Sequence, residues 1–145
     1  MKDFSEVQLE EVVRGFLDKT LDKSLWTHHA HITTAIWHLL HFDKEDALCR
    51  LRSGIISYNI SVGGENTGQS GYHETITIFW WDIIGKFLDQ HPGITYAEAC
   101  HKFLNSPMAE KEYPFRFYSR ENLLSAIARS RYVQPDLVQE LTPSF

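Results

Sequence analysis

Apolar residues recur every three or four positions along most of the chain, which is the spacing of one face of an α-helix. The first three predicted helices cover about residues 5–19, 27–41 and 43–56. Ser5 and Gln8 stand three positions apart ahead of the first apolar run, as in a capping box that satisfies the free N–H groups of a helix start. We therefore expect the first part of the chain to be helical, with Ser5 as the cap of the first helix and Thr27 as the cap of the second.

The helical pattern breaks between Ser61 and Gly71, where four of eleven residues are glycine. Beyond this Gly-rich loop the periodicity resumes and predicts three more helices, over about residues 72–90, 95–104 and 121–131. Long loops inside compact domains often carry function, because rigid elements on both sides hold their polar groups in place. The sequence leaves two alternatives open, a functional loop and a flexible connector.

Strand-length runs of alternating apolar and polar residues are missing from the sequence. A chain of 145 residues is long enough to bury a core without disulfides, and no linker divides it. The predicted fold is therefore all-α. We expect a single, bundle-like domain over residues 1–145, with about six helices and one Gly-rich loop before the fourth helix.

Acidic residues outnumber basic ones, 19 to 14, and the net charge is −5 with histidine neutral. No Lys/Arg cluster stands out, so the electrostatic signature of a nucleic-acid or membrane partner is missing. No apolar run approaches the ~20 residues of a membrane span, and the first residues lack the apolar stretch of a signal peptide. Cys49 and Cys100 lack the spacing of a metal or redox motif. We expect a cytoplasmic protein with no nucleic-acid and no membrane partner.

Five of the eight histidines fall within the segment from His28 to His41. On a helix, His28 and His31 would stand ~60° apart and ~4.5 Å along the axis, close enough for both rings to reach one ion or ligand. His73 lies on the predicted inward face of the fourth helix, where a buried ring must find a polar partner. We expect His28, His31 and His73 to converge where the second and fourth helices begin.

Three interpretations of this histidine group remain open. In the first, His28, His31 and His73 bind a divalent metal such as zinc or iron, since three neutral nitrogens leave open positions on the ion. In the second, they form a metal-free ligand pocket in which His73 and Glu74 carry acid–base catalysis. In the third, they form a structural hydrogen-bond network, and Glu74 stabilises the N-terminus of its helix by its charge.

Three sequence motifs contain these candidates: W-T-H-x-x-H from Trp26, Y-H-E-T-I-T from Tyr72, and F-Y-S-x-x-x-L-x-S-x-x-A-R from Phe117. In these motifs the chain resembles a family of small, mostly bacterial proteins of uncharacterised function, over about residues 12–137. The resemblance implies one functional site that draws on all three motifs, without indicating its activity, and its residues are His28, His31, His73, Glu74, Tyr118, Ser119 and Arg129.

The leading functional interpretation is a histidine-lined pocket for an unidentified small molecule, and a metal-dependent enzyme is one form of it. The alternative is a non-catalytic helical interaction module, in which exposed aromatic residues from Phe115 to Tyr118 mark a partner surface. The adjacent residues Trp80 and Trp81 point ~100° apart on a helix and cannot both enter one core seam. Together with the 13% aromatic content, this pair predicts a homodimer.

Overall fold

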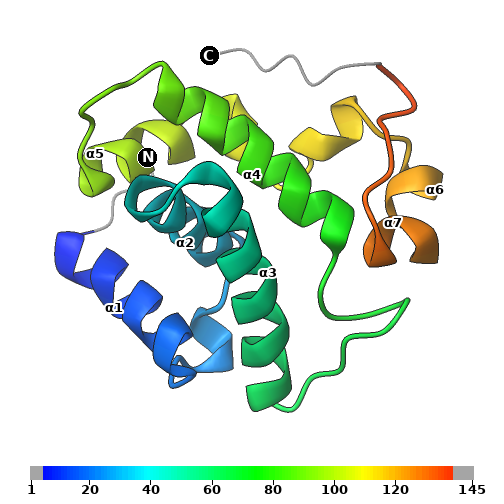
Figure 1. Cartoon of the computed structure of the whole chain (residues 1–145), viewed down its shortest axis with the longest axis horizontal. Helices are drawn as coiled ribbons and strands as arrows, with labels where there is room; N and C mark the ends of the chain where they lie inside the picture. Colours follow the sequence, from blue (N-terminus) through cyan, green and yellow to red (C-terminus); the bar gives the residue numbers. More distant parts are fainter. Residues whose placement is uncertain (1–4, 139–145) are drawn as a thin grey trace.

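Seven α-helices lie within residues 5–138, the part of the chain that the computed structural model describes (Figure 1). They are α1 (Glu6–Asp18), α2 (His28–His41), α3 (Lys44–Ser61), α4 (Glu74–Asp89), α5 (Tyr96–Leu104), α6 (Arg120–Leu123) and α7 (Ala126–Ser130). Short 3-10 turns lie between them at Lys23–Leu25, Pro107–Ala109 and Tyr113–Arg116. No strand occurs in the described range, which confirms the predicted all-α class. Residues 1–4 and 139–145, which the sequence prediction counted in the domain, lie outside this range.

The predicted cap residues begin the first two helices. Ser5 Oγ accepts from the Gln8 N–H at 3.1 Å, and Gln8 Oε1 accepts from the Ser5 N–H at 3.0 Å. Thr27 Oγ1 accepts from the Ala30 N–H at 3.2 Å. These bonds satisfy N–H groups that have no partner inside the helix, so α1 and α2 begin where the local sequence predicts.

The predicted last helix, residues 121–131, is in fact two short helices. α6 ends at Leu123, and α7 begins after Ser125. Ser125 Oγ accepts from the Ala128 N–H at 3.1 Å and donates to the Asn122 carbonyl at 2.8 Å. A serine side chain that bonds to the backbone on both sides replaces the hydrogen bonds of a continuous helix. The predicted helix is therefore divided at Ser125, and the described residues contain seven helices where about six were expected.

α2 and α4 form the centre of the domain. α2 contacts α1, α3, α4 and α5, while α4 also contacts α3 and α7. Ile36 of α2, Ile83 and Ile84 of α4 and Phe103 of α5 have no exposed surface. Burying each of these side chains stabilises the fold by roughly 1.5–3 kcal/mol, which is why the apolar stripes of the sequence face inward.

The aromatic segment around Phe115 is not the exposed partner surface that the alternative interpretation, an interaction module, required. Phe117 and Tyr118 are 5% and 0% exposed and belong to the main core beside Phe79. The Tyr118 hydroxyl donates to the Val133 carbonyl at 2.8 Å. A 3-10 turn just before these residues directs them into the core, and helical periodicity does not reveal such a turn.

Trp80 and Trp81 both find partners inside the chain. Trp80 is 8% exposed and packs in the main core. Trp81 faces the start of α3, where its Nε1 donates to the Lys44 carbonyl at 2.7 Å and the Lys44 ammonium lies 5.4 Å from the ring centroid. The second tryptophan therefore needs no dimer surface, and homodimerisation stays a prediction.

Thr75 ties the C-terminal segment to α4 through the hydrogen bonds of its hydroxyl group. Its buried hydroxyl lies 2.7 Å from the Ala128 carbonyl and 3.0 Å from the Arg131 carbonyl, and it accepts from the Val133 N–H at 3.2 Å. A second buried threonine, Thr34, has a hydroxyl without a hydrogen-bond partner within the described residues. The paired Thr75 hydroxyl should therefore stabilise the fold, whereas the Thr34 hydroxyl should destabilise it, because an unpaired buried polar group costs about 1–3 kcal/mol.

Replacing Thr75 by valine is expected to lower the free energy of unfolding by about 1–3 kcal/mol, because it leaves the Val133 N–H without its acceptor. Thr34→Val removes an unpaired hydroxyl, so it should leave stability unchanged or raise it. The two changes are matched, since threonine and valine have similar helix propensities. Urea denaturation followed by circular dichroism measures both variants. Equal losses of stability would contradict these hydrogen-bond assignments.

Candidate functional site

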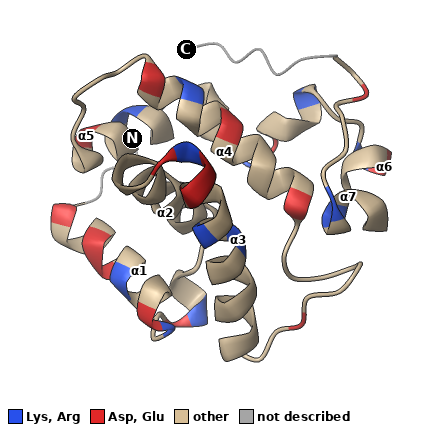
Figure 2. Cartoon of the chain, viewed as in Figure 1, with Lys and Arg blue, Asp and Glu red and all other residues tan. Residues whose placement is uncertain are grey.

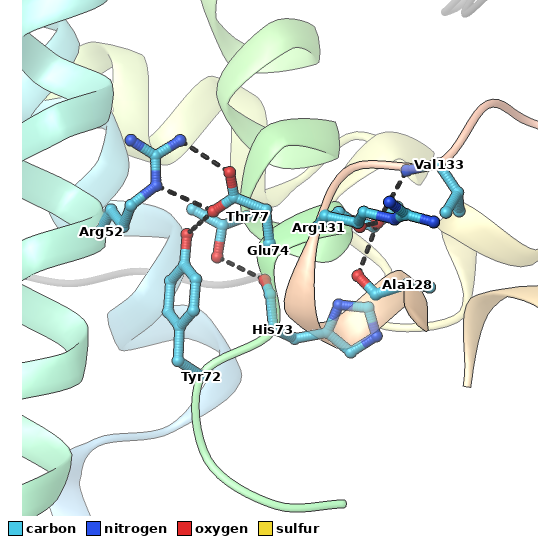
Figure 3. Close-up of polar contacts among 9 residues, drawn as sticks. Arg52, Tyr72, His73, Glu74, Thr77, Ala128, Arg131 and Val133 are labelled. Atoms are coloured by element: carbon cyan, nitrogen blue, oxygen red, sulfur yellow. Dashed lines mark hydrogen bonds and ion pairs between the residues drawn. The ribbon is translucent and has the colours of Figure 1, made fainter. Parts of the chain in front are cut away.

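Three consecutive residues at the start of α4 point in different directions (Figure 3). The side chains of Tyr72 and Glu74 lie toward α3, whereas the His73 ring lies against the segment that carries α6 and α7. His73 is the N-cap residue, with an extended backbone at φ −129° and ψ 107°. Neighbouring side chains of an extended backbone alternate in direction. The predicted position of His73 on the inward helical face is therefore corrected.

His73 uses both ring nitrogens to hold the backbone. Nδ1 accepts from the Ile76 N–H at 3.1 Å, and Nε2 donates to the Leu123 carbonyl at 2.8 Å. These two partners assign the proton to Nε2. Burial lowers the pKa of His73, which keeps the ring neutral at pH 7. In this arrangement no ring nitrogen is left to bind a metal or to accept a proton from a substrate, contrary to the predicted catalytic role.

His28 contacts a different part of the chain. Its Nε2 lies 2.8 Å from the Ala109 carbonyl, and its ring centroid lies 5.5 Å from that of Trp80. Within residues 5–138, no group of three His, Cys, Asp or Glu side chains is placed to hold a metal ion. The arrangement of His28, His31 and His73 therefore does not support the predicted zinc or iron centre.

His31 stacks on Trp26, with the ring centroids 4.0 Å apart. It also lines a cavity of about 50 Å³ between α2, α3 and α4, together with Thr77. Removal of water from around the ring lowers the pKa of His31 to about 4, with smaller contributions from the charges of His28 and Lys111, although part of the residue reaches solvent. His31 is thus a neutral ring at pH 7 with packing partners of its own.

On the α3 side, Glu74 forms a paired hydrogen bond with Arg52 (Figure 3). Arg52 Nε donates to Oε1 at 2.9 Å and Nη2 donates to Oε2 at 2.7 Å, while the Tyr72 hydroxyl donates to Oε1 at 2.6 Å. Burial raises the pKa of Glu74, but the bonds from Arg52 and Tyr72 outweigh this effect and hold the pKa below its usual value. Burial and the bond to Glu74 raise the pKa of Tyr72. At pH 7 Glu74 is therefore an ionised acceptor, and Tyr72 keeps its proton.

The Gly-rich loop is held in place by asparagine side chains. Asn66 Oδ1 accepts from the Tyr72 N–H at 2.9 Å and from Asn59 Nδ2 at 3.1 Å. Gly71 adopts φ +81°, and a Cβ there would collide with the Glu65 carbonyl, so only glycine fits this position. These contacts hold the loop in one conformation, which argues against the flexible connector.

A polar cleft of about 430 Å³ lies between α3, the Gly-rich loop and α7, and we call it the loop cleft. Arg129 of α7 reaches it and donates from Nη1 to the Gly71 carbonyl at 2.8 Å. Figure 2 shows the acidic start of α4 between basic positions on α3 and α7. The charges of Arg52 and Glu74 balance, so Arg129 leaves the cleft with a net positive charge. The lining residues are Arg52, Ile56, Asn66, Thr67, Gly68, Tyr72, Glu74, Arg129 and Ser130.

The resemblance placed seven residues in one site, and the structure brings only two of them, Glu74 and Arg129, to the loop cleft. Tyr118 is buried in the core, as described above. Ser119 caps α6, because its Oγ accepts from the Asn122 N–H at 3.1 Å. The remaining three are the histidines, each of which has separate partners.

Sequence reasoning missed Arg52, Asn66 and Tyr72 as residues of this cleft. Tyr72 opens the Y-H-E-T-I-T motif, and Asn66 lies in the Gly-rich loop, so both positions carried a signal. Arg52 carried none, since it is one basic residue on a helix whose partner, Glu74, lies 22 positions away.

Comparison with protein-family models, with curated proteins and with solved structures found no match to the chain. None of the helices between residues 5 and 138 is long and apolar enough to cross a membrane. Any functional conclusion therefore depends on the geometry of the loop cleft itself.

His73→Ala is expected to lower the free energy of unfolding by about 1–3 kcal/mol, because the Ile76 N–H and the Leu123 carbonyl lose their partner. His73→Asn should recover part of this loss, since asparagine is a favourable N-cap residue. Urea denaturation measures both variants. A fully stable His73→Ala protein would contradict the structural role of this ring.

The lowered pKa values of His31, His38 and His73 predict that acid destabilises the fold. Below about pH 6.5 the histidines of the unfolded chain take up protons, whereas the three folded rings stay neutral until a lower pH. Proton uptake therefore stabilises the unfolded state relative to the folded state. The free energy of unfolding should fall between about pH 7.5 and pH 5.5, above the range in which carboxylates titrate. His31→Gln should reduce this slope. A flat profile in urea denaturation at these pH values would show the prediction to be wrong.

Proposed function

We propose that the chain binds a small anionic ligand, bearing a carboxylate or a phosphate group, in the loop cleft. The observation that carries the proposal is that the Arg129 guanidinium keeps most of its hydrogen-bond donors unused. Its guanidinium lines the cleft, donates to one backbone carbonyl, and forms no ion pair within the described residues. A guanidinium presents five N–H donors in a planar fork that matches carboxylate and phosphate oxygens. Most of these donors remain for a ligand.

The walls of the cleft support this proposal because they are already in place. Arg52 is fixed by Glu74, and the Glu74 side chain is only 15% exposed. Asn66 holds the loop against α3 through its bonds to Asn59 and to the Ile56 carbonyl, and the Ile56 side chain supplies an apolar wall. A volume of about 430 Å³ lies within the ~300–1,000 Å³ range of small-ligand sites. A site of this kind loses little entropy when a ligand binds.

We infer a role in binding for Glu74, in place of acid–base catalysis. Both carboxylate oxygens already accept hydrogen bonds from Arg52, and one accepts from Tyr72 as well. A general base at pH 7 needs a pKa near the working pH, and that of Glu74 lies below its usual value. The proposal is therefore a ligand-binding protein, with Glu74 orienting Arg52.

Several expectations from the sequence remain proposals beside this one. They are membership of the resembling family, a cytoplasmic location, the lack of nucleic-acid and membrane partners, and a homodimer. The alternative of a non-catalytic interaction module also stays open. Half-exposed Leu124 and Ile127, on α6 and α7, are the apolar residues that such a module would present beside the loop cleft.

Inorganic phosphate and succinate are the probes that test the binding proposal. Isothermal titration calorimetry of the full chain should give saturable binding of at least one of them, weakening as salt is added because partly exposed charges are screened. Arg129→Gln should weaken that binding by about tenfold or more, the usual consequence of losing a hydrogen bond to a charged group.

Arg131→Gln is the matched control, since Arg131 is an exposed neighbour that does not line the loop cleft. The Arg131→Gln protein should bind the same anion with the affinity of the unchanged chain. Equal weakening by Arg129→Gln and Arg131→Gln would mean that the anion responds to general charge, and the proposal would fail. Absence of binding for both probes would also overturn it.

A further inference from the structure

A second pocket, of about 320 Å³, lies between α1, the end of α2 and α3, away from the loop cleft. We call it the aromatic hollow, because Phe16, Trp37, His38 and Phe42 line it. Trp37 meets His38 edge-on with the ring centroids 5.0 Å apart, and it meets Phe42 edge-on at 5.9 Å. His38 and Phe42 lie 6.0 Å apart. These separations are typical of favourable aromatic contacts, so the rings form a defined apolar wall.

The floor of the aromatic hollow is polar at one point. His38 is 1% exposed, and its Nδ1 donates to the Thr34 carbonyl at 2.8 Å. The proton therefore sits on Nδ1, which leaves Nε2 as an acceptor. Nε2 has no hydrogen-bond partner within residues 5–138. Burial lowers the pKa of His38, so this acceptor persists at pH 7.

The rim of the aromatic hollow carries two cations, Arg50 and Lys19. The Arg50 guanidinium lies 4.0 Å from the centroid of the Phe42 ring, and its Nε donates to Asp46 at 2.9 Å. The two terminal nitrogens of Arg50 have no hydrogen-bond partner in the part of the chain that the structure describes. The Arg50 guanidinium, which lies over the Phe42 ring, can therefore pair with an anionic group at the rim.

We propose that the aromatic hollow binds a small planar aromatic carboxylate that also carries an N–H or O–H donor. The aromatic body packs against Trp37 and Phe42, the carboxylate pairs with Arg50, and the donor reaches Nε2 of His38. Each part of this ligand matches one feature of the pocket, which is why an aliphatic anion fits it less well. The proposal uses none of the contacts of the loop cleft. It is therefore independent of the anion site proposed there, and each proposal is tested separately.

Indole-3-carboxylate is the probe, because its ring N–H and its carboxylate point away from each other on the five-membered ring of one planar body. Titration of the ¹⁵N-labelled full chain should give saturable shifts of backbone signals from residues of the aromatic hollow. 2-Naphthoate has similar size and charge but no N–H, so it should bind more weakly. Signals from the loop cleft should not move with either compound.

Two variants make the test specific. Ser53 is an exposed residue on the edge of the aromatic hollow, and its side chain has no hydrogen bond within the described residues, so Ser53→Leu fills the pocket without disturbing the fold. The Ser53→Leu substitution should abolish the shifts that indole-3-carboxylate causes. Arg50→Gln should weaken binding by about fivefold, as expected for a partly exposed charge pair. Arg14→Gln, on an exposed position of α1 outside the pocket, is the matched control and should bind normally.

The proposal is overturned if indole-3-carboxylate causes no saturable shifts, or if Ser53→Leu binds it as well as the unchanged chain does. Shifts centred on the loop cleft would also overturn it. Equal affinity for 2-naphthoate would refute the role of His38 Nε2, and equal weakening by Arg14→Gln would refute that of Arg50.

Discussion

The paired hydrogen bond between Arg52 and Glu74 is the constraint on which the candidate site depends. It joins α3 to the start of α4 across 22 positions of sequence and fixes the direction in which the chain enters α4. With Glu74 held toward α3, the preceding extended residue, His73, must point to the opposite side. Tyr72 then returns to the α3 side and completes the network. The loop cleft exists because these directions are set.

Local features of the sequence predicted much of the fold. Helical periodicity and the caps at Ser5 and Thr27 gave correct helix starts, because a cap and its partner lie within three residues. Errors arose where the chain leaves helical geometry. The Ser125 bonds divide the last helix, and a 3-10 turn precedes the buried Tyr118, which the alternative interpretation had placed on an exposed surface. Neither event changes the spacing of apolar residues, so periodicity could not reveal it.

The candidate site was harder to predict, because its partners are distant in sequence. The prediction treated His73 as a helical residue and so assigned it to the wrong face, although its neighbour Glu74 was a correct choice of cleft residue. The histidines drew attention as versatile ligands, yet the two at His28 and His73 bond to backbone carbonyls. Buried neutral imidazoles commonly satisfy the backbone in this way. The charge that distinguishes the cleft comes instead from Arg129, which a motif contained but whose partner the sequence did not identify.

The central claim is that the ligand site lies in the loop cleft, away from the histidines at the start of α2. Mapping of the backbone amide signals of the ¹⁵N-labelled chain during a phosphate titration tests this claim most directly. The account predicts the largest shifts at Asn66 to Tyr72 and around Arg129, where the loop and α7 enclose the cleft. Shifts centred on His28 to His31, with the loop unaffected, would contradict it.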